Sequence, residues 1–354
     1  MMPVINLDDA SAFKEIDRSD MLSHIAGLPS QLQSAWDLGG ELPLPAWEGI
    51  ERVVVAGMGG SAIGADLVSA YTASTCRVPL VVHRNYGLPA WAEGSGTLVI
   101  ASSHSGNTEE TLDAFKTAVA RGCLTLALAT GGELARSRQA SGSPLWRFEH
   151  EGQPRAAVGF SAGLLLAALS RLGLIPDPGK ELRDAVQAMG VQAETLGPDV
   201  PAANNPAKRM AGQLCGRWVT VVGADLLEPV ARRWKTQINE VAKAWSSFEA
   251  LPEADHNTLA GSANPEDAVA HTMVLFLRAP SCHPRNLLRT NLTKKAFMLE
   301  GLNTDFIDAA GDTPLAHQWT TLHFGDYAAY YLAMAYGVDP TAIPAIEMFK
   351  AELD

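Results

Sequence analysis

The alternation of short apolar runs with helical patterns is the feature that most constrains the fold of this chain. It begins at Val53 and continues to about residue 150. Apolar runs of strand length occur at 53–56, 79–83, 97–101, 124–129 and near 145–148, and helical patterns occur at 61–73, 107–121 and 156–174. Strands that alternate with helices in this way are typical of a mostly parallel, doubly wound sheet. The sequence therefore predicts an α/β unit in the first half of the chain.

The second half repeats the same order of a strand, a glycine turn and a helix. Strands are predicted at 218–223, 271–277 and 303–307, and helices at 226–244, 284–300 and 314–336. The fold class is thus α/β, with two doubly wound sandwich domains. An amphipathic helix over 8–37 precedes them, and residues 131–153 suggest a surface insertion. The predicted boundaries are an N-terminal helical extension (1–48), a first domain (49–178), a connection (179–206) and a second domain with a C-terminal helix (207–354).

Composition excludes several classes of protein. The chain has 354 residues, 47% of them hydrophobic, and a net charge of −12, so it can bury a core but offers no basic surface for nucleic acid or an anionic membrane. The four cysteines are far apart, and the histidines, including His317 and His323, lack metal-ligand spacing. No apolar stretch reaches membrane length. We expect a cytoplasmic protein with no metal and no cofactor.

Two glycine- and hydroxyl-rich turns carry most of the functional information. Gly57-Met58-Gly59-Gly60-Ser61 follows the first predicted strand, and Ser103-His104-Ser105-Gly106-Asn107-Thr108 follows the strand at 97–101. Each turn leads into a helix, whose first N–H groups are free and whose dipole is positive at that end. This arrangement binds phosphate. A simpler interpretation of the second turn is that Asn107 or Ser105 caps the helix.

The first turn also fits the dinucleotide fingerprint. A Rossmann site needs an acidic residue at the end of the next strand to hold the ribose. That strand ends at His83-Arg84-Asn85, without an acid, although Arg84 is of the right type to meet a 2′-phosphate. Alone, this turn leaves a nucleotide, another phosphate and tight packing open as explanations, and an NADP oxidoreductase stays as an alternative.

Taken together, the two turns resemble those of the sugar isomerase (SIS) domain, and within it the bifunctional phosphoglucose/phosphomannose isomerases. The resemblance extends from about residue 50 to the end of the chain. Further segments that carry it are Gln153–Ala157, Gln237–Lys243, Leu251–Asn257 and Gly337–Thr341 with Lys350. It implies two SIS-type domains and an enzyme that interconverts glucose 6-phosphate, and mannose 6-phosphate, with fructose 6-phosphate.

The resemblance also implies roles for individual residues. Glu240 would be the base that moves a proton between C1 and C2 through an enediolate. His256 would assist ring opening from the neighbouring subunit of a homodimer, and Arg155 would stabilise the enediolate. Lys350 matches a family lysine that points into the site. The phosphate ligands would be Gly59, Gly60, Ser61, Ser103, Ser105 and Thr108.

Two positions depart from the family pattern: His104 stands where relatives often have an aromatic residue, and Thr258 where an acid is common. Two other functions keep the fold. One is a sugar-phosphate sensor without catalysis, and the other is an isomerase of a different phosphosugar. A sensor needs phosphate contacts but no base, so Glu240, His256 and Arg155 together favour the enzyme.

Overall fold

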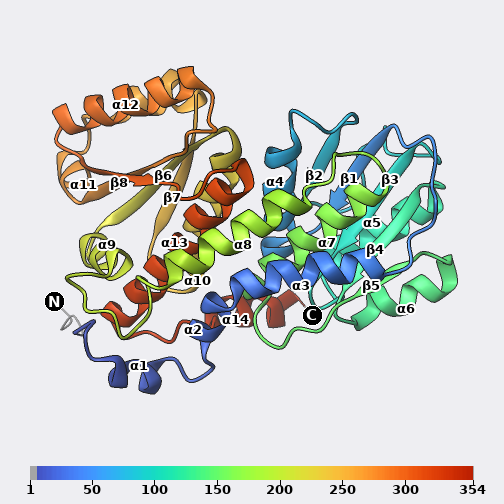
Figure 1. The fold of residues 1–354 in the computed structure, drawn as a ribbon, viewed down its shortest axis with the longest axis horizontal. Coiled ribbons are helices and arrows are strands. Elements are labelled where there is room, and N and C mark those ends of the chain that lie inside the picture. The colour runs from blue at the N-terminus through green and yellow to red at the C-terminus, as the bar shows by residue number, and fades with distance from the viewer. Residues whose placement is uncertain (1–5, 354) are drawn as a thin grey trace. The chain divides into compact units, whose positions relative to one another are not determined.

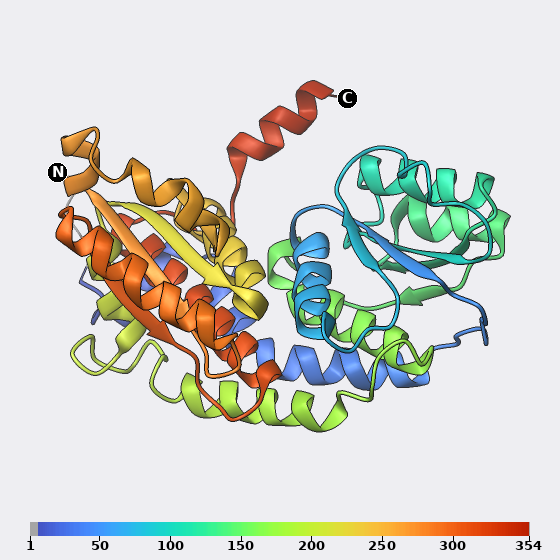
Figure 2. The same cartoon turned by 90° about the horizontal axis from the view of Figure 1, so that it is seen from above.

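The computed structural model of the protein describes residues 6–353, without the side chains of residues 138–141. This part of the chain divides into two compact units. The first α/β unit comprises residues 28–186, and the second α/β unit comprises the residues up to 27 and those from 187 onward. Each unit has one parallel sheet with helices on both faces (Figure 1 and Figure 2). The predicted fold class is confirmed, whereas the division into four predicted segments remains a prediction.

The sheet of the first unit has five parallel strands in the order β2-β1-β3-β4-β5. Its central strands are apolar and buried on both faces, as a parallel sheet covered by helices requires. The strands are β1 (Arg52–Ala56), β2 (Leu80–His83), β3 (Thr97–Ser102), β4 (Leu124–Ala129) and β5 (Leu145–Arg147).

The helices of the first unit cover both faces of its sheet. The connection from β1 to β2 and those from β3 through β4 to β5 run in opposite directions along the sheet, so right-handed crossovers place their helices on opposite faces. The helices are α3 (Leu28–Glu41), α4 (Gly59–Thr72), α5 (Glu109–Ala120), α6 (Gly132–Ser141), the 3-10 turn η1 (Pro154–Ala156), α7 (Val158–Arg171) and α8 (Gly179–Ala193), within which the division between the units falls.

The N-terminal region differs from the single helix predicted over 8–37. It forms α1 (Ala10–Ile16), α2 (Met21–Ala26) and α3, because Asp20 takes a left-handed conformation (φ 55°) and Gly27 ends α2. Only α3 belongs to the first unit, where it packs closely on α7. A Cβ at Gly163 would lie 2.7 Å from the Cβ of Ala35, so the absence of a side chain there permits the close approach.

Residues 131–153 are not a surface insertion, so that prediction is wrong. They contain α6 and then β5, which pairs with β4 in the sheet. Trp146 of β5 is fully buried and donates from its indole nitrogen to the carbonyl oxygen of Pro43, 2.8 Å away. The segment therefore completes the sheet and its core.

The sheet of the second unit has four parallel strands in the order β7-β6-β8-β9. Three of them match predicted strands, and the edge strand β7 was missed. Its sequence, Ser-Ser-Phe-Glu-Ala-Leu, lacks an apolar run because an edge strand is buried less. The strands are β6 (Trp218–Ala224), β7 (Ser246–Leu251), β8 (Thr272–Arg278) and β9 (Asn303–Asp308).

Helix α13 (Pro314–Tyr336) forms the centre of the second unit, and 21 of its 23 residues are buried. It packs against α10 (Glu228–Glu240), which follows β6. No helix in residues 6–353 is both long enough and apolar enough to cross a membrane. The other helices are α9 (Pro206–Leu214), α11 (Glu266–Ala270), α12 (Pro284–Leu299) and α14 (Pro344–Leu353), with 3-10 turns η2 (Asp225–Leu227), η3 (Glu253–His256) and η4 (Thr258–Gly261).

A buried ion pair fixes α10 on α13. Arg233 donates to both carboxylate oxygens of Asp326, at 3.2 and 2.8 Å, and both residues are almost fully buried. One residue later, Trp234 donates to the carbonyl oxygen of Thr321 at 3.0 Å. A Cβ at Gly325 would lie only 2.2 Å from the Trp234 indole nitrogen. This tight packing sets the position of α10, whose last residue is Glu240.

Candidate functional site

The two predicted phosphate turns lie side by side at one edge of the first sheet. The strand order reverses between β1 and β3, and ligands of open α/β sheets bind at the carboxyl ends of such neighbouring strands. Ala56, at the end of β1, lies opposite Ala101 of β3. The turns also contact each other directly, because the His104 backbone N–H donates to the Ser61 hydroxyl at 3.2 Å.

The first turn presents the start of α4 without a side chain in the way. Gly59 has φ +50°, a conformation that favours glycine. Met58 occupies the N-cap position in an extended conformation, and no described side chain caps the helix. The first N–H groups of α4 are therefore oriented for an anion.

The second turn is held in shape by its own hydroxyls. The Ser103 hydroxyl lies 2.9 Å from the Thr108 hydroxyl and accepts a hydrogen bond from the Gly106 N–H at 3.1 Å. The Ser105 hydroxyl accepts one from the Asn107 N–H at 3.2 Å. Ser103 is buried, whereas Ser105 is exposed and Thr108 is half-buried. The structure thus brings Ser61, Ser103, Ser105 and Thr108 together on two adjoining turns.

The simpler interpretation of this turn, a capped helix, is wrong. Thr108 occupies the N-cap position of α5, and no side chain among the described residues caps that helix. The Asn107 amide oxygen instead accepts a hydrogen bond from the Glu133 N–H at 2.9 Å, across the turn after β4. The N–H groups at the start of α5 consequently remain available to an anion.

Arg155 lies on η1, which packs against the first turn. A Cβ at Gly60 would lie 2.5 Å from the carbonyl oxygen of Pro154 and 3.2 Å from the Cα of Arg155. The Gln31 side chain of α3 holds the same segment, donating to the Ala156 carbonyl oxygen at 2.9 Å and accepting from the Gly159 N–H at 2.7 Å. Arg155 is 3% exposed. The position of Arg155 is thus set by the phosphate turn itself, and the sequence held no signal for the role of Gln31.

The corresponding place in the second sheet already holds a carboxylate. The strand order reverses there between β6 and β8, and Asp225 follows β6. Its carboxylate accepts hydrogen bonds from the His283 N–H at 2.9 Å and from the Asn286 side chain at 2.8 Å, at the start of α12. In the second unit the Asp225 carboxylate therefore takes up part of this place, although α10 also begins there without a side-chain cap.

Glu240 is the last residue of α10 and is half-buried. The helix predicted to continue to residue 244 stops here, because Lys243 takes a left-handed conformation (φ 53°). The Lys243 ammonium group donates to the backbone carbonyl oxygens of Glu240, at 3.0 Å, and of Val241, at 3.3 Å, and it also contacts that of Asp339. Lys243 therefore fastens the backbone at the end of α10.

His256 is exposed at the end of η3, on a firmly held loop. The preceding residue, Asp255, accepts hydrogen bonds from Arg289, at 2.8 Å, and from the Thr293 hydroxyl, at 2.6 Å, both on α12. Ala254 is buried in the core of the unit. Thr258, one of the two departures from the family pattern, donates its N–H and hydroxyl to the Asn257 side chain. The loop thus presents an accessible imidazole from a rigid base.

Glu240 and His256 lie at opposite ends of the strands of the second sheet. Helix α10 runs from the carboxyl end of β6 to the amino end of β7, so Glu240 lies at the amino edge. His256 follows the carboxyl end of β7, a strand of six residues that spans about 20 Å. Within one chain the second unit therefore keeps these two side chains about a strand length apart.

Lys350 lies on α14, a helix with no buried residue. Ile346, Phe349 and Leu353 follow helical spacing on one side of α14, and they are 39%, 61% and 66% exposed. The structure does not bring Lys350 together with Glu240 or His256, so its predicted role stays a prediction.

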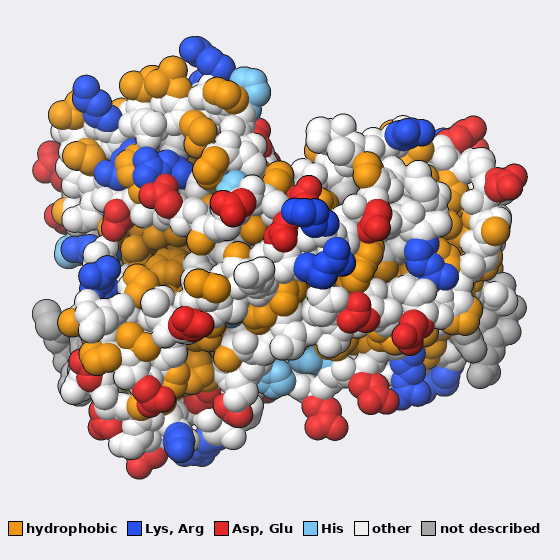
Figure 3. All heavy atoms as spheres, in the orientation of Figure 1, with side chains coloured by type: hydrophobic (Ala, Val, Ile, Leu, Met, Phe, Trp, Pro, Cys, Tyr) orange, Lys and Arg blue, Asp and Glu red, His pale blue; other side chains and the backbone are white. Residues whose placement is uncertain are grey.

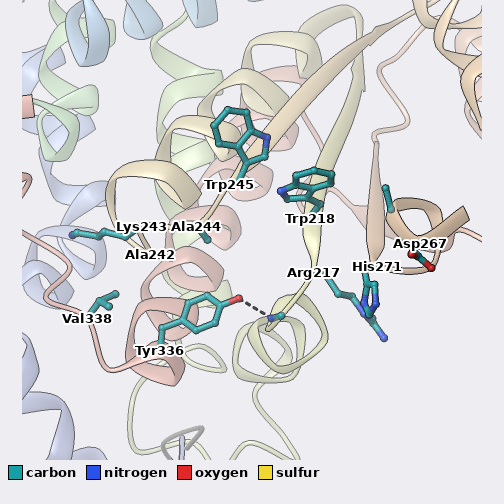
Figure 4. Close-up of a pocket in the computed structure, with 12 residues that line it drawn as sticks. Arg217, Trp218, Ala242, Lys243, Ala244, Trp245, Asp267, His271, Tyr336 and Val338 are labelled. Atoms are coloured by element: carbon teal, nitrogen blue, oxygen red, sulfur yellow. Dashed lines mark hydrogen bonds between the residues drawn. The ribbon is translucent and has the colours of Figure 1, made fainter. Parts of the chain in front are cut away.

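The second unit has a pocket of about 620 Å³, lined in part by residues 242–245, which follow Glu240 in the chain (Figure 4). Trp218, Trp245 and Tyr336 supply its aromatic lining, and Lys243 lies at one side. None of the predicted catalytic or phosphate-binding residues lines it.

In the first unit, Arg84 forms an ion pair with Asp66 of α4, so the residue considered for a 2′-phosphate already has a carboxylate partner. On the face seen in Figure 3, acidic and basic side chains are interspersed.

Comparison with known proteins agrees with this geometry. Residues 203–353 match the family described as the bacterial phospho-glucose isomerase C-terminal SIS domain. A bifunctional phosphoglucose/phosphomannose isomerase of Caldicellulosiruptor bescii is 35% identical over 337 residues, which cover 94% of this chain and 98% of that protein. One from Aquifex aeolicus is 32% identical over 315 residues, covering 87% and 94%.

Among solved structures, the C-terminal domain of glucosamine-fructose-6-phosphate aminotransferase from Francisella tularensis shares the fold. Its TM-score is 0.71 at 13% identity, and the match covers 91% of this chain and 98% of that one. This identity over nearly the whole length of the relatives leads to one assignment, and the two SIS-like sheets agree with it. The chain belongs to the family of bifunctional phosphoglucose/phosphomannose isomerases.

Proposed function

We propose that the protein interconverts glucose 6-phosphate and mannose 6-phosphate with fructose 6-phosphate by proton transfer through an enediolate. The observation that carries this proposal is the pair of uncapped helix N-termini beside Ser61, Ser103 and Thr108, in a chain that retains Glu240. The turns would hold the phosphate, since N–H groups at helix starts bind anions. A pure sensor would need these turns but not the base.

The proton transfer needs one carboxylate and one stabilised oxyanion. Glu240 would take the proton from C2 or C1 and return it to the neighbouring carbon. Arg155 would stabilise the enediolate oxygen, as a buried cation does for a developing negative charge. His256 would move a proton between O1 and O5 while the ring opens. Lys350 can act only if α14 packs its apolar side against protein, which burial of Phe349 and Leu353 would favour.

The close contact behind Gly60 leads to a first prediction. In Gly60→Ala, the new methyl group would meet the backbone of Pro154 and Arg155 and would force the phosphate turn away from the arginine segment. Overpacking of this kind costs about 1–3 kcal/mol of stability. Because a misplacement of about 1 Å can reduce the rate about 100-fold, we expect kcat/KM for fructose 6-phosphate to fall about 10- to 100-fold. Gly40→Ala is the matched control, because a Cβ there meets nothing within 4 Å. Equal activity of the two variants would contradict this role of Gly60.

The separation of Glu240 from His256 supports a homodimer in which each active site takes His256 from the other subunit. The prediction is complementation between two inactive variants, Glu240→Gln and His256→Ala. In a mixed dimer one site would carry both changes and the other neither. Random assembly makes half of the dimers mixed, so co-expression should restore about one quarter of the wild-type activity.

The control for complementation is co-expression of two differently tagged Glu240→Gln chains, which should stay inactive. When the Glu240→Gln and His256→Ala chains carry different tags, the mixed dimers isolated through both tags should have about half of the wild-type activity. Failure of the mixed species to exceed the separate variants would show that His256 acts within its own chain, or not at all.

A further inference from the structure

The phosphate turns are poor in positive charge for a site that binds a dianion. Residues 57–64 and 103–108 contain no Lys or Arg, and their one basic side chain is His104. The first turn of α5 carries two acids, Glu109 and Glu110, which oppose a phosphate. A compensating charge near the turns would therefore strengthen binding, and His104 is placed to supply it.

His104 is fixed in the turn by its backbone. Its N–H donates to Ser61, and its carbonyl oxygen accepts from the Thr130 N–H at 3.0 Å and from the Thr130 hydroxyl at 2.7 Å. A movement of His104 would therefore also move Ser61, one of the residues proposed to bind phosphate.

The His104 imidazole forms a hydrogen bond with a second histidine. Its Nε2 lies 2.9 Å from Nδ1 of His150, five residues before Arg155. The two rings meet edge to face, with centroids 5.1 Å apart. Phe148 and Phe160 stack at 4.9 Å and border the pair. The pair thus links the phosphate turn to the segment that leads to Arg155.

The chemistry of two imidazoles at this distance limits the number of protons they can hold. A nitrogen-to-nitrogen hydrogen bond needs one N–H and one lone pair. A neutral pair satisfies this, and so does a pair with one added proton, whose hydrogen bond is charge-assisted. A second added proton would place two N–H groups against each other and break the bond. The pair can therefore carry one positive charge, shared between its rings.

We propose that the His104–His150 pair takes up one proton when the phosphate of the substrate binds, and so supplies the positive charge that the two turns lack. The proposal rests on the proposed function, because it assumes that these turns bind a sugar phosphate. His104 and His150 are positioning and charge-supplying residues in it; they do not touch the reacting carbons.

Burial favours an uncharged His104 before substrate arrives, since it lowers the pKa of that imidazole below the ordinary histidine value. No charged neighbour contributes to that shift among the described residues. The segments packed around the pair supply hydroxyls from Ser61, Ser103, Ser105 and Thr130. The charged residues on these segments are Glu109, Glu110, Glu133, Arg147, Glu149, Glu151 and Arg155.

The direction of the pH effect follows from linkage. A phosphate dianion raises the pKa of the pair, so the extra affinity is fully present below the pKa of the free pair. It is lost as the pH rises through the pKa of the complex. The phosphate group itself has a second pKa near 6, which opposes binding only at more acidic pH. The effect should therefore be measurable between about pH 6 and 8.5.

The test is the binding of fructose 6-phosphate to the Glu240→Gln protein, which avoids turnover, measured by calorimetry across this pH range. The comparison is the same protein with His150→Gln, which can donate a hydrogen bond to His104 but cannot share a proton. Between pH 6 and 8.5, we expect the affinity of the Glu240→Gln protein to fall by a factor about five times larger than that of the protein that also carries His150→Gln. Titration in two buffers with different ionisation heats should show proton uptake only when both histidines are present.

His104→Gln should give the same pH profile as His150→Gln, and thermal unfolding checks that both variants are folded. His271→Gln, an exposed histidine of the second unit, is the control and should leave the profile unchanged. Identical pH profiles with and without His150 would overturn this inference and leave the proposed function standing. Absence of binding by Glu240→Gln at every pH would overturn the proposed function as well.

Discussion

Glu240→Gln should reduce kcat for the conversion of fructose 6-phosphate by about 10²- to 10⁴-fold while leaving KM nearly unchanged. The amide has the shape of the carboxylate but cannot accept a proton from carbon. Glu240 is half-buried at the end of α10, and its backbone is fastened by Lys243, so the amide should keep the position of the native side chain. Initial rates over a range of substrate concentrations would separate kcat from KM.

Two further variants sharpen this experiment. Glu228→Gln changes a glutamate in the first turn of the same helix, about 3.9 Å from Arg232, and should leave both constants near their wild-type values. Glu240→Asp keeps the base but withdraws it by one methylene, so an intermediate rate is expected. If Glu240→Gln retained a rate close to wild type, Glu240 would not be the base.

Asp326→Ala should lower the free energy of unfolding by about 3–5 kcal/mol, because it leaves the Arg233 guanidinium buried without its carboxylate. Both side chains are only 2–4% exposed, and Arg233 donates to both oxygens of Asp326. Since Arg233 is on α10, the loss should also disturb the helix that carries Glu240. Urea unfolding followed by tryptophan fluorescence would measure the change in stability.

The surface pair Arg278–Asp308 is the matched control. Arg278 donates to both oxygens of Asp308, at 2.7 and 2.8 Å, but the side chains are 28% and 64% exposed. Asp308→Ala should therefore cost at most about 1 kcal/mol. Equal losses for the two aspartates would mean that burial of the Arg233–Asp326 pair does not decide its contribution.

The sequence was sufficient for the elements whose pattern is local. The strands of the first sheet were predicted to within a residue or two, because each is an apolar run bounded by glycine or polar residues. The phosphate turns were predicted correctly as strand-to-helix connections for the same reason. In contrast, β7 was missed because it has no apolar run. Helix α9 was also missed, although Ala207, Met210, Ala211 and Leu214 follow helical spacing after the Asn205 cap and Pro206.

The contacts that organise the candidate site depend on residues far apart in the chain. His150 meets His104 across 46 residues, and Gln31 of α3 holds the Arg155 segment from more than 120 residues away. The end of α10 at Glu240 depends on the left-handed conformation of Lys243, a residue type that seldom takes it. No local pattern indicates such features, so they become visible only in the folded chain.

Incubation of the purified protein with fructose 6-phosphate, without added metal or nucleotide, tests the proposed activity most directly. The products would be resolved by a method that separates glucose 6-phosphate from mannose 6-phosphate. Formation of both sugars is the predicted result, since an enediolate that can present either face to Glu240 is protonated to both. Formation of glucose 6-phosphate alone would contradict the bifunctional assignment, and absence of turnover would contradict the isomerase activity itself.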